Sequence, residues 1–320
     1  MKRGFGYSLV FAVCGLAGAA YAHGNDRHEG DHGPGVDISF IEVQSLDLTK
    51  QPPQPLIVKG KLQIPRHPGH HNGFRNGDHK LPAVVILHGS AGVDSRGDFY
   101  AEALNDAGIA TLAIDMWEAR KVSVTGRPKA PILTLPDAFA ALRYLANLPN
   151  IDADRIGVIG FSWGGVMTLG SAEQLYAAQF GRGLTFAAHV ANYPVCYGAN
   201  DPRLVYPLSP AAAGTQFLNL TGAPMLIQIG TEDDYDNGAQ HCLDLAASVN
   251  SAGPVDVEVY EGAYHAFDRI QVPISEQDPF GNEGSILTTG VVPTVQMVPN
   301  VEQAYRSRHR VVEFFTHTLQ

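Results

Sequence analysis

Residues 160–165 read Gly160-Phe161-Ser162-Trp163-Gly164-Gly165, and this stretch decides how the rest of the chain is interpreted. The apolar run at 155–159 is typical of a buried strand, and residues 166–173 have the composition of a helix start. A strand, then Gly-x-Ser-x-Gly, then a helix is the pattern of a nucleophile elbow, a sharp turn that exposes a serine hydroxyl.

The residue types suit that turn. Gly160 and Gly164 stand two before and two after Ser162, where strand and helix approach too closely for larger side chains. The turn is expected to hold Ser162 in strained backbone geometry. The helix start directs free N–H groups and partial positive charge at this point, which favours a developing oxyanion.

A phosphate-binding loop is not supported by the residues around these glycines. A Walker motif requires Lys and then Ser or Thr after Gly165, but the chain has Val166-Met167, and no Gly-x-Gly-x-x-Gly is present. A chance occurrence of Gly-x-Ser-x-Gly is the remaining alternative, so the context of the motif must decide.

Strand-like and helix-like segments alternate along the chain, which predicts the α/β class with a doubly wound, mostly parallel sheet flanked by helices. The chain is long enough for one large domain of this kind. Strands are expected at 83–87, 109–114, 155–159, 185–190, 224–229 and 255–260. Helices are expected to follow Ser162 and at 99–107, 135–148, 238–249 and 301–317.

The N-terminus predicts export. Two basic residues precede an apolar segment at 7–20 that is too short to span a bilayer, and Ala20-Tyr21-Ala22 offers a cleavage site before His23. We therefore expect a signal peptide at 1–22 and a secreted or periplasmic protein.

Residues 23–80 are expected to form a polar extension, and residues 81–320 the catalytic domain. The extension has histidine-rich patches at 23–35 and 66–80, and between them two leading strands at 36–48 and 56–64. Imidazoles bind zinc or copper, but neither patch has tight ligand spacing, so no specific metal site is predicted.

The net charge of −10 argues against nucleic acid and anionic membranes as partners. Two cysteines follow the expected signal peptide, Cys196 and Cys242. In an oxidising compartment they either pair or stay as buried thiols.

Polar groups directly follow four predicted strands: Ser90 within His88-Gly89-Ser90, then Ser162, Asp233 and His265. Carboxyl ends of parallel strands meet at one edge of a sheet, so these groups are expected to converge there. The order Ser, Asp, His is that of α/β-hydrolases.

Taken together, these pieces resemble the dienelactone hydrolase family. The matching segments are 88–92, 160–165, Gly230-x-x-Asp233 and 262–267 (Gly-Ala-Tyr-His-Ala-Phe), within residues 81–267.

The resemblance implies an α/β-hydrolase fold without a cofactor or metal. Ser162 would be the nucleophile, His265 its general base, and Asp233 the group that orients His265. The backbone N–H groups of Ser90 and Trp163 would form the oxyanion hole. Asp234 is the alternative to Asp233 as the acid.

The chain departs from the family's named enzyme at two positions. That enzyme has cysteine where Ser162 stands and an acidic residue where Gly89 stands, and serine favours ordinary esterase chemistry. Arg120 and Arg269 lie in stretches where that enzyme places substrate-binding arginines. They either clamp a substrate carboxylate or form structural salt bridges.

Residues 268–300 make an insertion too long for a simple connection, and with 197–221 they are expected to cover the pocket. We interpret the chain as an exported serine hydrolase that cleaves a small-molecule ester or lactone through an acyl-enzyme. Peptide or thioester cleavage on the same fold is one alternative. A secreted non-catalytic binding or metal-sequestering protein is the other, and the sequence indicates no oligomeric state.

Overall fold

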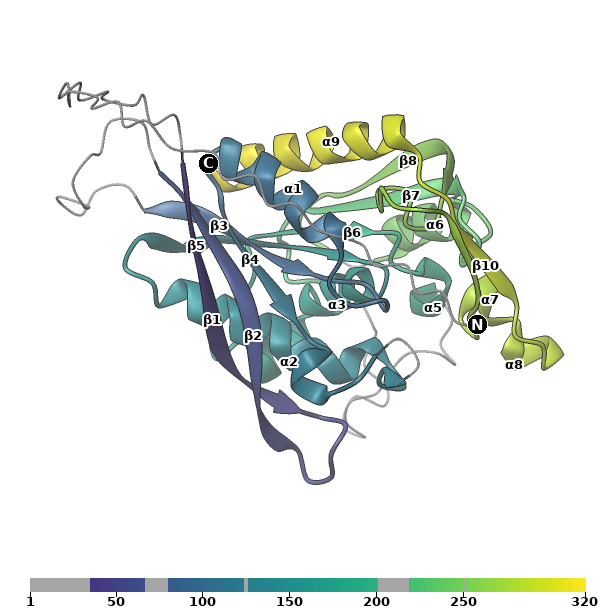
Figure 1. Ribbon diagram of the computed structural model, residues 1–320, viewed down its shortest axis with the longest axis horizontal. Coiled ribbons are helices and arrows are strands. Elements are labelled where there is room, and N and C mark those ends of the chain that lie inside the picture. The colour runs from purple at the N-terminus through teal and green to yellow at the C-terminus, as the bar shows by residue number, and fades with distance from the viewer. Residues whose placement is uncertain (1–34, 67–79, 124–125, 201–218, 250) are drawn as a thin grey trace, which may run out of the picture. The chain divides into compact units, whose positions relative to one another are not determined.

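The computed structural model describes residues 35–66, 80–123, 126–200, 219–249 and 251–320 (Figure 1). The expected signal peptide and the histidines of both patches lie outside these residues.

One sheet of eight strands, ordered β1-β2-β4-β3-β5-β6-β7-β8, organises the fold. Strands β3 to β8 run parallel, and β2 is antiparallel to both β1 and β4. This is the expected doubly wound, mostly parallel sheet of the α/β-hydrolase fold. The strands are β1 (Val36–Asp47), β2 (Gln54–Pro65), β3 (Leu81–Leu87), β4 (Ala110–Asp115), β5 (Ile151–Phe161), β6 (Ala188–Asn192), β7 (Met225–Glu232) and β8 (Val255–Tyr264).

Helices cover both faces of this sheet. Helices α1 (Ser95–Asp106) and α9 (Val301–Leu319) lie side by side on one face, and α2 (Leu135–Ala146) and α3 (Trp163–Ser171) pack together on the other (Figure 1). Every residue of β3 is buried, because both faces of this central strand are covered. That is why it appears in the sequence as an unbroken apolar run.

The two leading strands belong to the same sheet. Strand β1 pairs along its whole length with β2, and β2 continues into the body by pairing Lys59 with Asp115 of β4. The described residues from 35 onward belong to one compact unit, in which the two leading strands share a sheet with the rest of the strands.

The remaining elements are short, and the sequence patterns did not predict them. They are the 3₁₀ turns η1 (Glu118–Arg120) and η3 (Pro131–Thr134), helices α4 (Gln174–Phe180), α5 (Cys196–Asn200), α7 (Gly281–Gly284) and α8 (Ile286–Thr289), and the hairpin of β9 (Ile274–Gln277) and β10 (Thr294–Met297). Helix α6 (Gln240–Ser248) was expected. None of the described helices has the length and hydrophobicity needed to cross a bilayer.

Candidate active site

Ser162 stands at the turn between β5 and α3, as the elbow motif predicts. Its backbone has φ 52° and ψ −107°, a conformation that residues with side chains rarely adopt. A Cβ on Gly160 would lie 2.0 Å from the carbonyl oxygen of Gly164, and one on Gly164 would lie 2.3 Å from that of Leu87. Only glycine fits at either position, and the tight packing holds the turn in this conformation.

His265 and Asp233 reach Ser162 from two other strand ends. His265 follows β8 directly, and its Nε2 lies 2.9 Å from Ser162 Oγ. Asp233 follows β7, and its Oδ2 lies 2.7 Å from His265 Nδ1. A carboxylate only accepts hydrogen bonds, so Nδ1 donates to Asp233 and Nε2 is left to accept the hydroxyl proton.

Asp233, rather than Asp234, is the acid that meets His265. The other oxygen of Asp233 accepts the backbone N–H groups of Tyr235 at 2.9 Å and Asp236 at 3.4 Å, which fixes the carboxylate. Asp234 turns away and accepts the N–H of Gln296 at 2.6 Å, so it ties the insertion to this loop.

Two aromatic rings flank the fully buried imidazole of His265. The Tyr235 ring centroid lies 4.1 Å away and the Tyr193 centroid 4.8 Å away. They leave the imidazole little room to turn away from Ser162.

A buried polar network supports Tyr193. Its hydroxyl donates to Asp268 at 2.5 Å and accepts from Arg96 at 3.0 Å, and Arg96 in turn pairs with Asp94. Burial raises the pKa of Asp268, and the nearby Arg96 opposes that rise. The network fixes Asp268, which lies three residues after His265 in the chain. It therefore helps to hold the imidazole of His265 in position.

The expected oxyanion-hole residues, Ser90 and Trp163, line the same cavity as Ser162. The Trp163 N–H belongs to the first turn of α3, where backbone N–H groups have no acceptor within the helix. A Cβ on Gly89 would lie 3.7 Å from the Ser162 Cβ, so the loop that carries Ser90 runs beside the nucleophile position.

His88 and Trp117 hold that loop in place. His88 Nδ1 donates to the carbonyl of Gly89 at 2.7 Å, and its Nε2 accepts the N–H of Met116 at 3.0 Å. Burial lowers the pKa of His88, which keeps it in the neutral form that this pair of bonds requires. The Trp117 indole N–H donates to the carbonyl of Ser90 at 2.9 Å. The motif residue His88 is therefore structural.

A cavity of about 310 Å³ opens beside Ser162. Its walls are mainly apolar and come from α3, from the segment around α5 and from the insertion, including Phe280 and Ile286. The expectation that 268–300 covers the pocket is confirmed for the part between Asp278 and Leu287, which lines the cavity. The same expectation for residues 197–221 is confirmed for Tyr197 to Ala199, which line the cavity. Residues 201–218 lie outside the described part of the chain.

Neither arginine expected to bind a substrate carboxylate lines this cavity. Arg120 is buried against Asp137, with Nη1 2.6 Å from Oδ2, and it also donates to the carbonyl of Met116. Arg269 lies outside the cavity, with its Nε 3.7 Å from a carboxylate oxygen of Asp94. In this structure both arginines form the salt bridges of the second alternative.

A different cation, which no sequence motif indicated, lines the cavity. Arg127 Nη2 lies 2.7 Å from Asp278 Oδ2, and both residues are part of the cavity wall. Their segments are far apart in the sequence, and neither belongs to a recognisable motif.

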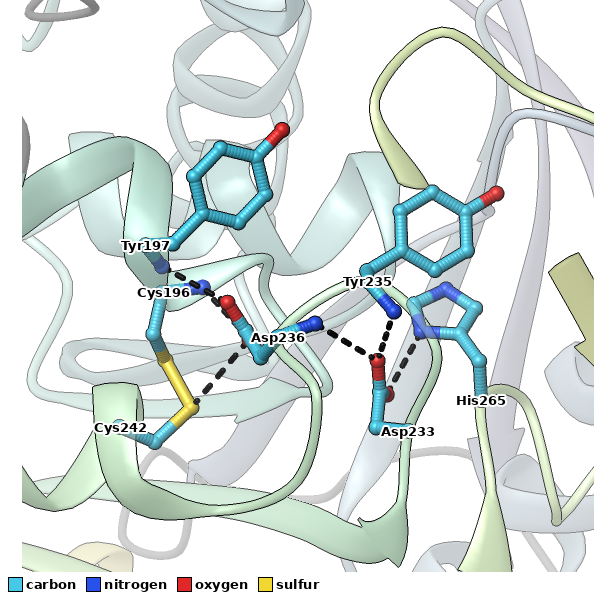
Figure 2. The surroundings of a disulfide bond; sticks show 7 residues. All are labelled: Cys196, Tyr197, Asp233, Tyr235, Asp236, Cys242 and His265. Atoms are coloured by element: carbon cyan, nitrogen blue, oxygen red, sulfur yellow. Dashed lines mark hydrogen bonds and ion pairs between the residues drawn. A yellow bond between two sulfur atoms is a disulfide. The ribbon is translucent and has the colours of Figure 1, made fainter. Parts of the chain in front are cut away.

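Cys196 and Cys242 form a disulfide that joins α5 to α6, with their Cα atoms 5.1 Å apart (Figure 2). Asp236 lies between this bond and Asp233. It accepts the N–H groups of Cys196 at 2.8 Å and Tyr197 at 2.7 Å. Burial, with repulsion from Asp233, raises the pKa of Asp236 to about 7.

Among the described residues, Cys196, Asp236 and Cys242 also form the one group with the spacing of metal ligands. The sulfur atoms of Cys196 and Cys242 are bonded to each other, so the two cysteines are not thiolate ligands in this form.

An eight-stranded, mostly parallel sheet with a serine elbow, a histidine and an aspartate at its strand ends defines the α/β-hydrolase class. The sequence model of the dienelactone hydrolase family matches residues 72–319, and the chain belongs to this family of hydrolases.

Individual relatives are more distant. A probable 2-oxo-3-(5-oxofuran-2-ylidene)propanoate lactonase from Bradyrhizobium sp. is 25% identical over 220 residues, 63% of this chain and 82% of that protein. A putative dienelactone hydrolase from Klebsiella pneumoniae has a TM-score of 0.52 at 18% identity, over 87% of this chain and 98% of its own. Thermogutta terrifontis esterase 2 has a TM-score of 0.56 at 17% identity, over 81% and 88% of the two chains. At these identities, the two structures resemble this chain in fold.

Proposed function

We propose that the chain is an exported serine hydrolase that cleaves a carboxylic ester or lactone through an acyl-enzyme on Ser162. The observation that carries the proposal is the continuous chain of short contacts from Ser162 Oγ through the imidazole of His265 to Asp233. Family membership and the probable lactonase among the relatives support the ester or lactone class.

In the first half of the reaction, Ser162 Oγ attacks the carbonyl carbon while its proton passes to His265 Nε2. Asp233 stabilises the resulting imidazolium through Nδ1. The carbonyl oxygen becomes an oxyanion and accepts hydrogen bonds from the N–H groups of Ser90 and Trp163. Collapse breaks the bond to the leaving oxygen, which takes the proton from Nε2.

In the second half, a water molecule gives its proton to Nε2 and attacks the acyl carbon. The second oxyanion collapses, the carboxylic acid leaves, and Ser162 Oγ recovers its proton. For a lactone the leaving alcohol stays attached to the acyl group, so one hydroxy acid is released.

Two features support export. Residues 1–22 have the organisation of a signal peptide, and a disulfide between Cys196 and Cys242 is typical of oxidising compartments.

The test is labelling with a fluorophosphonate, read by intact-protein and peptide mass spectrometry together with p-nitrophenyl ester turnover. One label is expected on Ser162, absent in Ser162→Ala, and turnover of Ser162→Ala and His265→Ala should fall by about 10³-fold or more. The intact mass of the exported protein should also lack residues 1–22.

Ser171→Ala is the matched control. Ser171 is a buried serine at the other end of α3 whose hydroxyl donates to the carbonyl of Thr168, away from His265, so this variant should label like wild type. Label retained in Ser162→Ala, or a loss of turnover below tenfold in both active-site variants, would reject the proposed roles.

A further inference from the structure

The cavity beside Ser162 contains one cation and one anion from the described residues, and they neutralise each other. Arg127 Nη2 and Asp278 Oδ2 lie 2.7 Å apart, and only 14% and 4% of the two side chains are exposed. Water is largely excluded from this pair, so solvent screens the two charges poorly and each acts strongly on the other.

Asp278 cannot readily leave Arg127. Besides the guanidinium, its Oδ2 accepts the hydroxyl of Tyr235 at 3.1 Å, and its Oδ1 accepts the N–H of Phe280 at 2.9 Å. Arg127 in turn stacks over the Phe280 ring at 5.6 Å. The donors come from three separate segments, so they fix the carboxylate where it masks the cation.

A substrate carboxylate that reached Arg127 would therefore meet the negative charge of Asp278 at nearly the same distance. The attraction and the repulsion would largely cancel, while the cost of removing the substrate charge from water would remain. Among the described residues, Arg120 and Arg269 lie outside the cavity wall and are paired with Asp137 and Asp94.

The rest of the wall suits a neutral chain. It includes Val166 and Leu169 of α3, Pro194 and Val195 before α5, and Ile286 and Leu287 of α8. Each methylene group of a substrate that is buried against such a wall should strengthen binding, or raise kcat/KM, by about fourfold.

We propose that the site selects a neutral ester with an apolar chain and rejects one that carries a carboxylate, and that Asp278 determines this selectivity by masking Arg127. The inference rests on the proposed function. It sets this chain apart from an enzyme that binds acidic lactones through free arginines.

Two esters of equal chain length test the inference, p-nitrophenyl hexanoate and the mono-p-nitrophenyl ester of adipic acid, at neutral pH. Wild type should prefer the hexanoate in kcat/KM by about tenfold or more, because burying an unpaired charge is unfavourable. Asp278→Asn keeps the side-chain size and unmasks Arg127, so the preference should move toward the adipate ester by about tenfold or more.

Glu276→Gln is the matched control. It removes the same charge from the same segment, on β9, but Glu276 does not line the cavity, so the preference should change by less than about threefold. The wild-type comparison is informative even should Asp278→Asn fail to fold.

Three outcomes would overturn the inference. A wild-type preference for the adipate ester would, and so would a change in Asp278→Asn no larger than that in Glu276→Gln. In both cases turnover itself shows that the proposed esterase function stands. Turnover of neither ester, together with no fluorophosphonate label on Ser162, would reject the proposed function and this inference with it.

Discussion

Ser162 has a positive φ because the backbones of β5, α3 and β3 meet around it. The exposure of its hydroxyl and the packing of the turn therefore depend on the same small residues. A strained backbone of this kind persists only where the surroundings enforce it, and here they include the carbonyl groups of Gly164 in α3 and Leu87 in β3.

Gly164→Ala should break this arrangement. The added Cβ would lie 2.3 Å from the carbonyl oxygen of Leu87, on a buried central strand that has no room to shift. We expect the free energy of unfolding to fall by about 3 kcal/mol or more, with loss of fluorophosphonate labelling in the protein that remains folded. Urea unfolding measures the first effect.

Gly97→Ala serves as the control, because nothing lies within 4 Å of the position that its Cβ would take in α1. This variant should be neutral or more stable by up to about 1 kcal/mol. Equal unfolding midpoints for the two alanine variants would contradict the account of the elbow.

At the scale of single residues, the sequence predicted groups at strand ends and failed for groups whose role depends on a distant partner. Ser162, Asp233 and His265 each directly follow a strand, so the parallel sheet brings them together. In the sequence, Arg120 lies in a stretch that suggests substrate binding, and Arg127 belongs to no motif. Only their partners in space, Asp137 and Asp278, show that the first is structural and the second lines the cavity.

Among the elements, the short helix α5 depends on contacts with the rest of the protein. Five residues do not form a stable helix in water alone. Asp236 accepts two N–H groups at its start, and the disulfide ties Cys196 to α6, so both fix one wall of the cavity to the loop that carries Asp233 (Figure 2).

Replacing both cysteines by alanine should therefore affect stability and substrate binding together. The disulfide spans 46 residues, and closing a loop of that length in the unfolded chain corresponds to about 4 kcal/mol of stability. We expect a loss of about 2–4 kcal/mol in urea unfolding. We also expect KM to rise more than kcat falls, because α5 lines the cavity while Ser162, His265 and Asp233 lie on other segments.

Reduction of the wild type by dithiothreitol should reproduce the loss of stability, and the double alanine variant should not respond to the reductant. If reduction of the disulfide left the unfolding curve of the wild type unchanged, the disulfide would not be needed to keep α5 in place.

Whether an element depends on tertiary contacts also explains whether it could be predicted from the sequence. Strands such as β3 and β7 contain long apolar runs that predict them locally. Helices α5, α7 and α8 and the β9–β10 hairpin have four or five residues per element, too few to show a period. They are fixed by tertiary contacts, such as the bond from the Tyr197 hydroxyl to the carbonyl of Phe280 at 2.7 Å.

For the whole molecule, the buried groups whose pKa values are shifted make stability depend on pH, and two of them, His189 and Asp236, act in opposite directions. Burial lowers the pKa of His189, in the central strand β6, from 6.5 to about 4. Its contribution to stability is present above its unfolded pKa and is lost as the pH falls toward 4. Asp236 has a pKa raised from 3.8 to about 7, so its contribution is complete at low pH and is lost as the pH rises through 7.

A variant at one of these groups separates its contribution from the other. His189→Gln removes the imidazole and leaves Asp236 to titrate as before, since neither group contributes to the pKa shift of the other. Between pH 7 and pH 4, the free energy of unfolding of the wild type should fall relative to His189→Gln by about 3 kcal/mol. Urea unfolding at several pH values measures this difference. His309→Gln, which removes an exposed histidine of α9, should follow the wild-type curve. Parallel curves for wild type and His189→Gln would mean that the buried imidazole does not govern acid stability, and that the loss must come from carboxylates elsewhere in the fold.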